Sequence, residues 1–137
     1  MVETKDKCEI INKIKLTITT SNKRGSGTDD PIKLYIGEHF WELKHPFCND
    51  FEKGKTDVFN LDVPENMTSD WFQYFCMKKD VAVKGKWILS RVKFEVNGRL
   101  IYDSGKIDYV FARGKTTWCA KDFFYGKCRG NVSPDFV

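Results

Sequence analysis

The amino-acid sequence predicts an all-β protein, an antiparallel β-sandwich of about eight short strands. The 137 residues include 11 Phe together with many Val and Ile, and these residue types favour strands. Apolar segments recur at spacings of roughly 8–12 residues with turn-forming residues between them, and no segment keeps a helical period. The length suits one domain with a hydrophobic core. We therefore expect residues 1–137 to form a single domain, with 1–9 as an N-terminal extension and 119–137 as a tail without assigned structure.

Strands are expected at four places in the first half of the chain. Residues 10–20 alternate between Ile or Leu and Lys or Thr, which is typical of a strand with one solvated face. The alternation resumes over residues 32–36, and Gly37-Glu38-His39 reads as a tight turn into a short returning strand at 40–43. Residues 56–61 alternate again.

The second half of the chain adds the remaining strands. Residues 71–77 are nearly all apolar, which is typical of a central strand that is covered on both faces. Residues 87–96 alternate most clearly, and Asn97-Gly98 predicts a type I′ hairpin turn into a strand at 99–103. We expect a last strand between residues 109 and 118.

Two polar loops between these strands gather carboxylates and small residues. They span residues 26–31 and 49–57. Calcium prefers six to eight oxygen ligands, and loops supply oxygens readily because their carbonyls are not committed to a sheet. The alternative is that Asp and Asn side chains in such turns bind their own backbone. The oxygen-bearing candidates are Asp29, Asp30, Asn49, Asp50 and Asp57.

Basic and aromatic residues suggest contact with a surface. The net charge is +4, and residues 106–129 hold six basic but only two acidic side chains. Such a segment could face an anionic membrane or a polyanion, or it could simply be a solvated surface. Aromatic residues in or near loops suit the headgroup layer of a membrane, although most could equally belong to the core. The candidates for lipid or partner contact are Phe40, Trp41, Phe47, Lys115, Trp118 and Lys121.

The sequence indicates a chain without catalytic function. The two histidines, His39 and His45, lie in no catalytic motif, and Ser26 lacks the strand-to-helix context of a nucleophile elbow. The glycines are not followed by the Gly-Lys-Ser/Thr of a phosphate-binding loop.

Localisation and cysteine pairing are less constrained. The polar N-terminus is not a signal peptide, and no apolar run reaches the length of about 18 residues of a membrane span. Two glycosylation sequons, at Asn66 and Asn131, permit a secreted origin. The five cysteines show no zinc-binding spacing, and their odd number leaves at least one thiol unpaired. Cys119 could pair with Cys128, Cys8 could tie the N-terminus to the tail, or all five could be reduced.

Four sequence blocks stand out in order along the chain. They are Gly27-Thr28-Asp29-Asp30; Trp41-Glu42-Leu43; Asn49-Asp50-Phe51-Glu52-Lys53-Gly54 with Asp57 and Phe59; and Trp87-Ile88-Leu89 ahead of Val92-Lys93-Phe94. Together they resemble the PLAT domain, the β-sandwich shared by polycystin, lipoxygenases and clostridial alpha-toxin. Their order and spacing fit over Ile14 to Asp103, and the similarity is closest to the C-terminal domain of the toxin.

The resemblance implies eight strands in two four-stranded sheets and a non-catalytic module that binds membrane lipid peripherally, with calcium as the candidate cofactor. A calcium-independent module that docks a protein partner or a parent enzyme is the alternative. Asp29, Asn49 and Asp50 match calcium-binding positions of toxin-like members, and Asp80 is a substitute for a further acidic ligand. Lys44 and His45 stand where such members have Asp and Asn. We expect no nucleic-acid partner, a monomer or part of a larger assembly, and a secreted or extracellular location.

Overall fold

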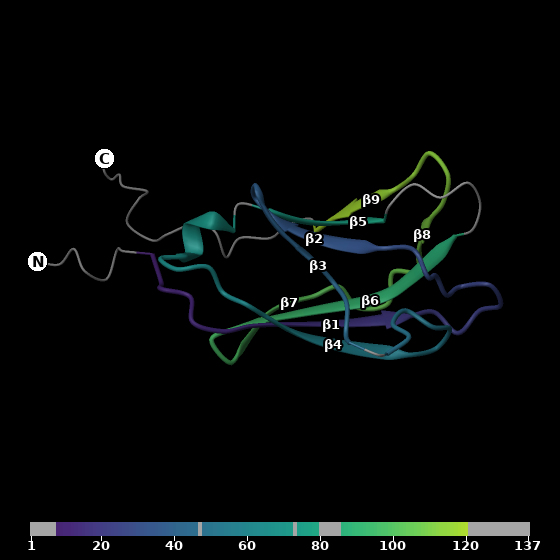
Figure 1. The fold of residues 1–137 in the computed structure, drawn as a ribbon, viewed down its shortest axis with the longest axis horizontal. Helices are drawn as coiled ribbons and strands as arrows, with labels where there is room; N and C mark the ends of the chain where they lie inside the picture. The colour runs from purple at the N-terminus through teal and green to yellow at the C-terminus, as the bar shows by residue number, and fades with distance from the viewer. Residues whose placement is uncertain (1–7, 47, 73, 80–85, 121–137) are drawn as a thin grey trace, which may run out of the picture.

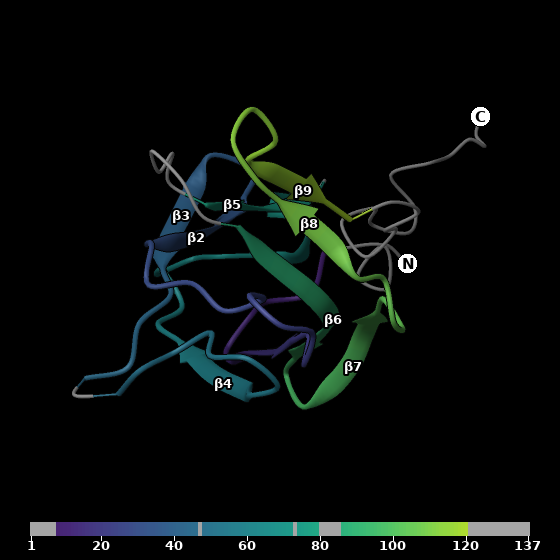
Figure 2. The same ribbon diagram turned by 90° about the vertical axis from the view of Figure 1, so that its right-hand side faces the viewer.

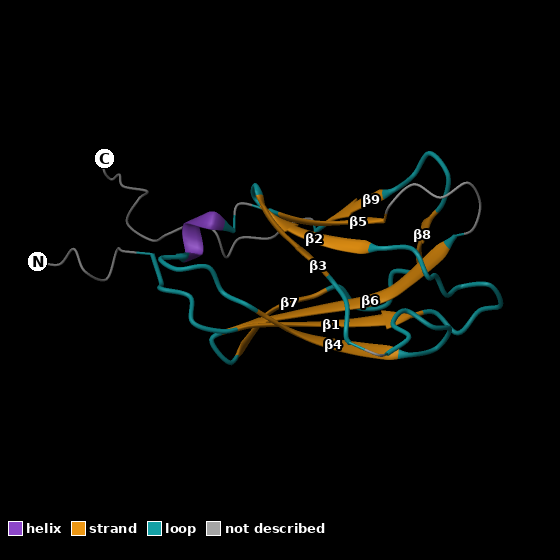
Figure 3. Ribbon diagram, in the orientation of Figure 1, coloured by secondary structure: helices purple, strands orange, loops and turns teal. Residues whose placement is uncertain are grey.

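The expected β-sandwich is confirmed by a computed structural model that describes residues 8–46, 48–72, 74–79 and 86–120. Two antiparallel sheets lie face to face in these parts of the chain (Figures 1 and 3). The strands are β1 (Ile14–Thr20), β2 (Ile32–Ile36), β3 (His39–Glu42), β4 (Thr56–Leu61), β5 (Phe75–Lys79), β6 (Trp87–Val96), β7 (Arg99–Asp103), β8 (Tyr109–Phe111) and β9 (Thr117–Cys119). No helix in the described part of the chain is long and apolar enough to cross a membrane.

The first sheet has the order β4-β1-β6-β7, with β8 also paired to β6. β6 is ten residues long, so one of its edges pairs with β8 near its start and with β7 near its end. The short strand β8 therefore adds a fifth strand to the sheet. In β1 the Ile and Leu residues are buried and the intervening Lys and Thr residues are not, as the alternation predicts.

The second sheet has the order β3-β2-β5-β9. A disulfide joins Cys76 of β5 to Cys119, the directly opposed residue of β9. This pairing corrects the alternative in which Cys119 pairs with Cys128, and it places Cys119 within a strand rather than in the tail. Cys8 is also disulfide-bonded, and Cys48 has an exposed free thiol.

The core fills the space between the sheets with aliphatic and aromatic side chains from both of them. Phe94 of β6 stacks on Phe75 of β5, with 4.9 Å between the ring centroids. Trp87 is fully buried and donates its indole N–H to the Thr20 hydroxyl at 3.0 Å. Burial of such rings supplies most of the stabilisation of a sandwich, because the apolar surface that they remove from water is large.

Three expected strands differ from the structure. The strand expected over residues 10–20 begins only at Ile14. The segment 71–77 is not continuous strand, because Ser69–Trp71 forms a 3-10 helix and β5 begins only at Phe75. An apolar run indicates burial, and burial alone does not separate a strand from a short helix. The segment 109–118 is two strands in different sheets, because Gly114 takes a φ of 80° in a tight turn between them.

The Asn97-Gly98 turn is confirmed, with φ values of 51° and 82° that suit a type I′ hairpin. The Asn97 side chain also binds the N-terminal segment. Its Oδ1 accepts the backbone N–H groups of Asn12 and Lys13 at 2.7 and 3.1 Å, and its Nδ2 donates to the Ile10 carbonyl at 2.8 Å. This turn lies at the end of the sandwich opposite the two polar loops (Figure 1).

Candidate functional site

The candidate site is the end of the sandwich that carries the two polar loops and the β8–β9 turn, which faces the reader in Figure 2. We call it the loop end, and its described loop segments are residues 21–31, 43–46, 48–55 and 112–116, with Lys86 at the start of β6. Strand pairing brings these segments together, since β1 ends where β4 and β6 begin and β5 ends where β2 begins.

Local hydrogen bonds fix the first loop against the second. Ser26 is buried and donates its hydroxyl to the Lys23 carbonyl at 2.5 Å, while its own carbonyl accepts the Ile88 N–H. A Cβ on Gly27 would lie only 3.0 Å from the carbonyl oxygen of Phe51, so the close approach of the two loops requires glycine. The Thr28 N–H donates to that same carbonyl at 3.0 Å.

The second loop is held in place by a buried carboxylate, that of Asp57. Phe51 has a φ of 62°, and its N–H donates to Oδ2 of Asp57 at 2.9 Å. Asp57 is 3% exposed, and burial of a carboxylate is costly without such hydrogen-bond partners. The Phe51 ring meets Trp87 edge to face, with 5.3 Å between centroids. Asp57 therefore anchors the loop to the core.

Three of the predicted calcium ligands line one pocket between these loops. The pocket has a volume of about 340 Å³ and includes Asp29, Asn49 and Asp50, with Asp30 beside them. The fourth predicted ligand, Asp80, lies outside the described residues. The fold therefore brings residues from two separate loops to one place, as a cation site requires.

Cationic side chains of the protein already hold most of these oxygens. Lys79 is only 3% exposed, and its ammonium lies 2.5 Å from Oδ2 of Asp30. The Lys55 ammonium donates to the Asn49 carbonyl at 2.7 Å and lies 3.3 Å from Oδ1 of Asp57. Each cation thereby takes an oxygen of the kind that calcium would bind.

His45 occupies both oxygens of Asp50. Its backbone N–H donates to Oδ2 at 2.8 Å, and its ring Nδ1 lies 2.7 Å from Oδ1. The other ring nitrogen lies 2.6 Å from the Val58 carbonyl, and the ring stacks on Phe59 at 4.3 Å. The hydrogen bond to Asp50 raises the pKa of His45 above its ordinary value, against a smaller lowering by desolvation.

The residues described at this end do not fit a calcium site as they stand. Calcium needs six to eight oxygens, whereas the two carboxylates Asp30 and Asp50 and the Asn49 carbonyl are committed to cationic side chains. His45, Asp50 and Asp57 bring potential metal-binding atoms within 4.8 Å of one another, but these atoms bond within the protein too. The Asp29 carboxylate is exposed at the pocket and remains the most available ligand.

The predicted contact residues are spread over the molecule. Phe40 is 50% exposed on the outer face of β3, whereas Trp41 packs against the core and donates its indole N–H to the Asp62 carbonyl at 2.8 Å. Trp118 also packs against the core, and Lys115 lies over the Tyr109 ring at the loop end. Phe47 and Lys121 lie outside the described residues.

Sequence reasoning missed an exposed basic surface at the loop end. Its members come from five separate segments of the chain, so the sequence shows no continuous run of basic residues there. Among the described loop residues of this end, the exposed acidic side chains are Asp29 and Glu52. The exposed basic side chains, which we call the basic surface, are Lys23, Arg24, Lys44, Lys53, Lys86, Arg113 and Lys115.

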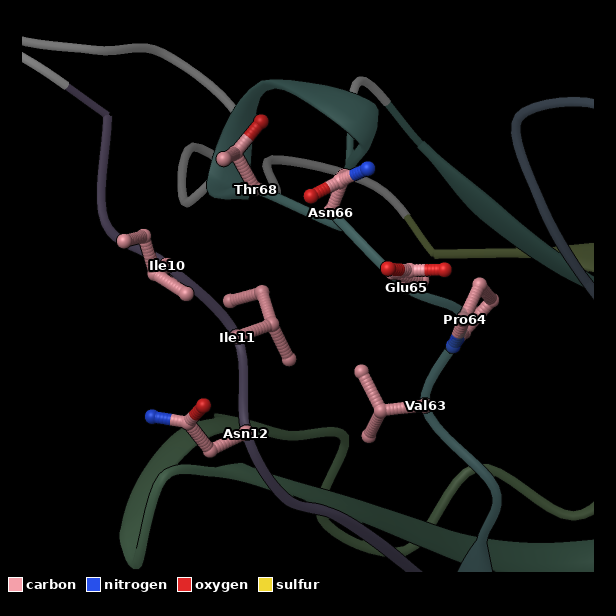
Figure 4. Close-up of a pocket in the computed structure, with 8 residues that line it drawn as sticks. All are labelled: Ile10, Ile11, Asn12, Val63, Pro64, Glu65, Asn66 and Thr68. Carbon is pink, nitrogen blue, oxygen red and sulfur yellow. The ribbon is translucent and has the colours of Figure 1, made fainter.

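A second pocket, of about 520 Å³, lies at the opposite end, between the N-terminal segment and the β4–β5 connection. Figure 4 shows Ile11 and Val63 facing one another across it. The Ile11 N–H donates to the Met67 carbonyl at 3.0 Å, so the two walls are joined by backbone hydrogen bonding. Its lining is mainly aliphatic and amide, and it offers no group of facing acids and bases for catalysis.

Comparison with known proteins agrees with this architecture. The sequence model of the PLAT/LH2 domain family matches residues 14–103. No curated protein sequence matches the chain.

Solved structures of other proteins share the fold. The alpha-toxins of Clostridium absonum and of an avian strain of Clostridium perfringens superpose with TM-scores of 0.73 and 0.73 at 21% and 20% identity, covering 85% and 87% of this chain but 33% and 34% of theirs. Coral 8R-lipoxygenase, which is described as having calcium activation via a C2-like domain, superposes with a TM-score of 0.60 at 18% identity and covers 79% of this chain and 16% of its own. The chain thus spans about a third of the toxins' length.

Proposed function

Because the chain belongs to the PLAT/LH2 domain family, we propose that it is a non-catalytic module that binds the surface of an anionic membrane peripherally through its loop end. The observation that carries this proposal is the basic surface. The described loop residues of this end include seven exposed basic side chains but only two exposed acidic ones. Each Lys or Arg near an anionic leaflet contributes about 1 kcal/mol of attraction.

The geometry of the loop end supports a surface contact. Loops at one end of a sandwich can meet a plane together, and binding residues are often found on loops that a rigid scaffold positions. Lys115 lies 4.7 Å from the centre of the Tyr109 ring, so a cation and an amphipathic ring stand side by side at this end. Aromatic rings of this kind suit the headgroup layer.

A calcium-assisted form of the function would recruit Asp29, Asn49, Asp50 and Asp80. We favour the calcium-independent form because Lys79 and His45 already bind carboxylates in that pocket. An extracellular setting is part of the proposal, since disulfides such as Cys76–Cys119 persist in oxidising compartments.

Vesicle sedimentation tests the proposal. The full chain is mixed with phosphatidylserine-containing vesicles and with pure phosphatidylcholine vesicles, in chelator and in calcium. We expect binding to the anionic vesicles alone, weakened by salt and equal in chelator and calcium.

A matched pair of variants tests whether the membrane contact lies at the loop end. The Arg24→Glu/Lys44→Glu variant changes the basic surface, and we expect it to weaken binding by about 30-fold or more. The Lys13→Glu/Lys93→Glu variant makes the same charge change away from the loop end and serves as the control. Equal loss in both variants, or no binding to either vesicle by the unaltered chain, would contradict the proposal.

The second candidate is a protein-interaction module, and the outer face of the second sheet favours it. Register places Phe40, Tyr35 and Cys76 in one row across β3, β2 and β5, and the row continues to Cys119. Phe40 lies 5.4 Å from Tyr35, centroid to centroid, and is half exposed. Inert vesicles, together with a discrete partner whose binding is lost in Phe40→Ser, would support this candidate instead.

A further inference from the structure

We infer that the protein's own cations, and Lys79 above all, stand where a metal ion would act at the loop end, so that these loops hold their shape without calcium. The inference concerns charge compensation within the fold and does not depend on what the loop end binds. Lysine is rarely buried in proteins, yet Lys79 lies on the inward face of a strand.

Lys79 shares the inward face of β5 with two core residues. Phe75 and Met77 are fully buried, and the alternation carries Lys79 to the same side. A buried ammonium without a partner is costly by several kcal/mol, so its position requires a fixed anion. Asp30 supplies that anion at 2.5 Å, because β2 pairs Ile32 with Lys79 and so holds the start of β2 beside it.

The partners of the other two cations resemble calcium ligands as well. Lys55 binds one backbone carbonyl and one carboxylate oxygen, those of Asn49 and Asp57. His45 binds the carboxylate of Asp50 through its ring and its backbone. Carboxylate and carbonyl oxygens, which in a calcium site would bind the ion, here bind the side-chain nitrogens of Lys55, His45 and Lys79.

These contacts also oppose the entry of a metal ion. A divalent ion between Asp29, Asn49 and Asp50 would have to displace the His45 hydrogen bonds to reach the Asp50 oxygens. It would gain little from Asp30, whose charge Lys79 already compensates. Removal of Lys79 frees one carboxylate and one unit of negative charge next to Asp29, which lines the same pocket. The pocket then becomes acidic enough to attract a cation.

Thermal unfolding of the full oxidised chain in chelator, calcium or magnesium at equal ionic strength tests the inference. We expect the unaltered chain to show the same Tm in all three. Lys79→Met keeps most of the length of the side chain without its charge, and we expect it to lower Tm in chelator by about 5 to 10 °C. Calcium at about ten times its Kd should then raise the Tm of this variant by roughly 3 to 5 °C.

Lys79→Arg keeps a cation at this position, and we expect it to remain indifferent to calcium. Should Lys79→Met not fold, the Lys79→Met/Asp30→Asn variant removes both charges, and recovery of a folded state in it shows that the unpaired Asp30 was the cause. A calcium-specific rise in the Tm of the unaltered chain would overturn the inference. So would a folded Lys79→Met that is as stable as the parent or that calcium does not stabilise. No lipid is present, so failure here is independent of failure to bind vesicles.

Discussion

At the scale of single residues, His45 binds the carboxylate of Asp50, which was one of the candidate calcium ligands. Both ring nitrogens face oxygen acceptors, Oδ1 of Asp50 and the Val58 carbonyl. Two acceptors are satisfied only when both nitrogens carry hydrogen, so this geometry favours the charged imidazolium. Asp50 and the nearby Asp57 are the anions that face it.

The stability of the loop should therefore depend on pH. The pKa of His45 in the folded protein is raised above its ordinary value of 6.5, mainly by the hydrogen bond to Asp50. The stabilisation is complete below pH 6.5 and is lost as pH rises through the raised folded pKa, because the neutral ring loses one of its two hydrogen bonds. We expect the free energy of unfolding to fall over this window, and we expect His45→Gln to flatten the profile.

Denaturant unfolding at several pH values measures this effect, and NMR titration of the His45 ring gives the folded pKa directly. His39, the other histidine, provides the control variant His39→Gln, which should keep the parent's pH profile. A His45→Gln profile as steep as the parent's would show that another group carries the dependence.

At the scale of elements, β9 is the strand that depends most on a covalent link. It is three residues long, and within the described part of the chain it pairs only with β5 at the edge of its sheet. Strands this short add little stability of their own. The Cys76–Cys119 disulfide fixes β9 to its neighbour and thereby keeps Trp118 against the core.

Removal of this disulfide should loosen β9 before the rest of the sandwich. The two cysteines are 43 residues apart in the sequence, and a loop of that size corresponds to a stabilisation of about 4 kcal/mol. We expect Cys76→Ala/Cys119→Ala to lose roughly this amount in denaturant unfolding. Hydrogen exchange should report early loss of protection at Ala120 N–H, which donates to the Phe75 carbonyl, while β1 and β6 stay protected. Uniform loss of protection across both sheets would contradict this view.

At the scale of the whole molecule, the sequence predicts the sandwich well because half-buried strands carry their burial in a period of two. The structure confirms the alternation in β1, in β2 and over residues 91–96 of β6, whereas Trp87, Ile88 and Leu89 at the start of β6 are all buried. The Asn97-Gly98 turn is equally local, and its residue types require one conformation. The boundaries of β5 were less predictable, because an apolar run in the sequence does not distinguish a strand from a 3-10 turn.

The candidate site was only partly predictable, since its charges meet through tertiary contacts. Asp29, Asn49 and Asp50 do line one pocket, as their loops suggested. Lys79 directly follows Lys78 in the sequence, and nothing in the neighbouring residues indicates that the Lys79 side chain points inward. Its partner Asp30 is 49 positions away. The basic surface was missed for the same reason, because its members are adjacent in space and not in sequence.

The same long-range pairing should make folding of the whole sandwich slow and dependent on β1. Leu16 lies opposite Phe59 of β4 and Phe94 of β6, so β1 joins strands that are far apart in the chain. All-β folds of this kind fold in milliseconds to seconds, because loop closure precedes the stabilising contacts. In this sheet β1 lies between β4 and β6, so β4 cannot join β6 and β7 until β1 is in place. The β6–β7 hairpin alone has two strands, and a two-stranded hairpin is only marginally stable in water.

Leu16→Ala should therefore both destabilise the protein and slow its refolding. Leu16 is fully buried, and we expect a loss of about 3 kcal/mol with much of it in the refolding rate. Stopped-flow tryptophan fluorescence of the oxidised chain measures the rates, since Trp87 packs against Phe51 and Phe111 in the core. Leu100→Ala on the exposed side of β7 is the matched control and should change both rates little. If Leu16→Ala accelerates unfolding and leaves refolding unchanged, β1 joins the sheets only after the rate-limiting step.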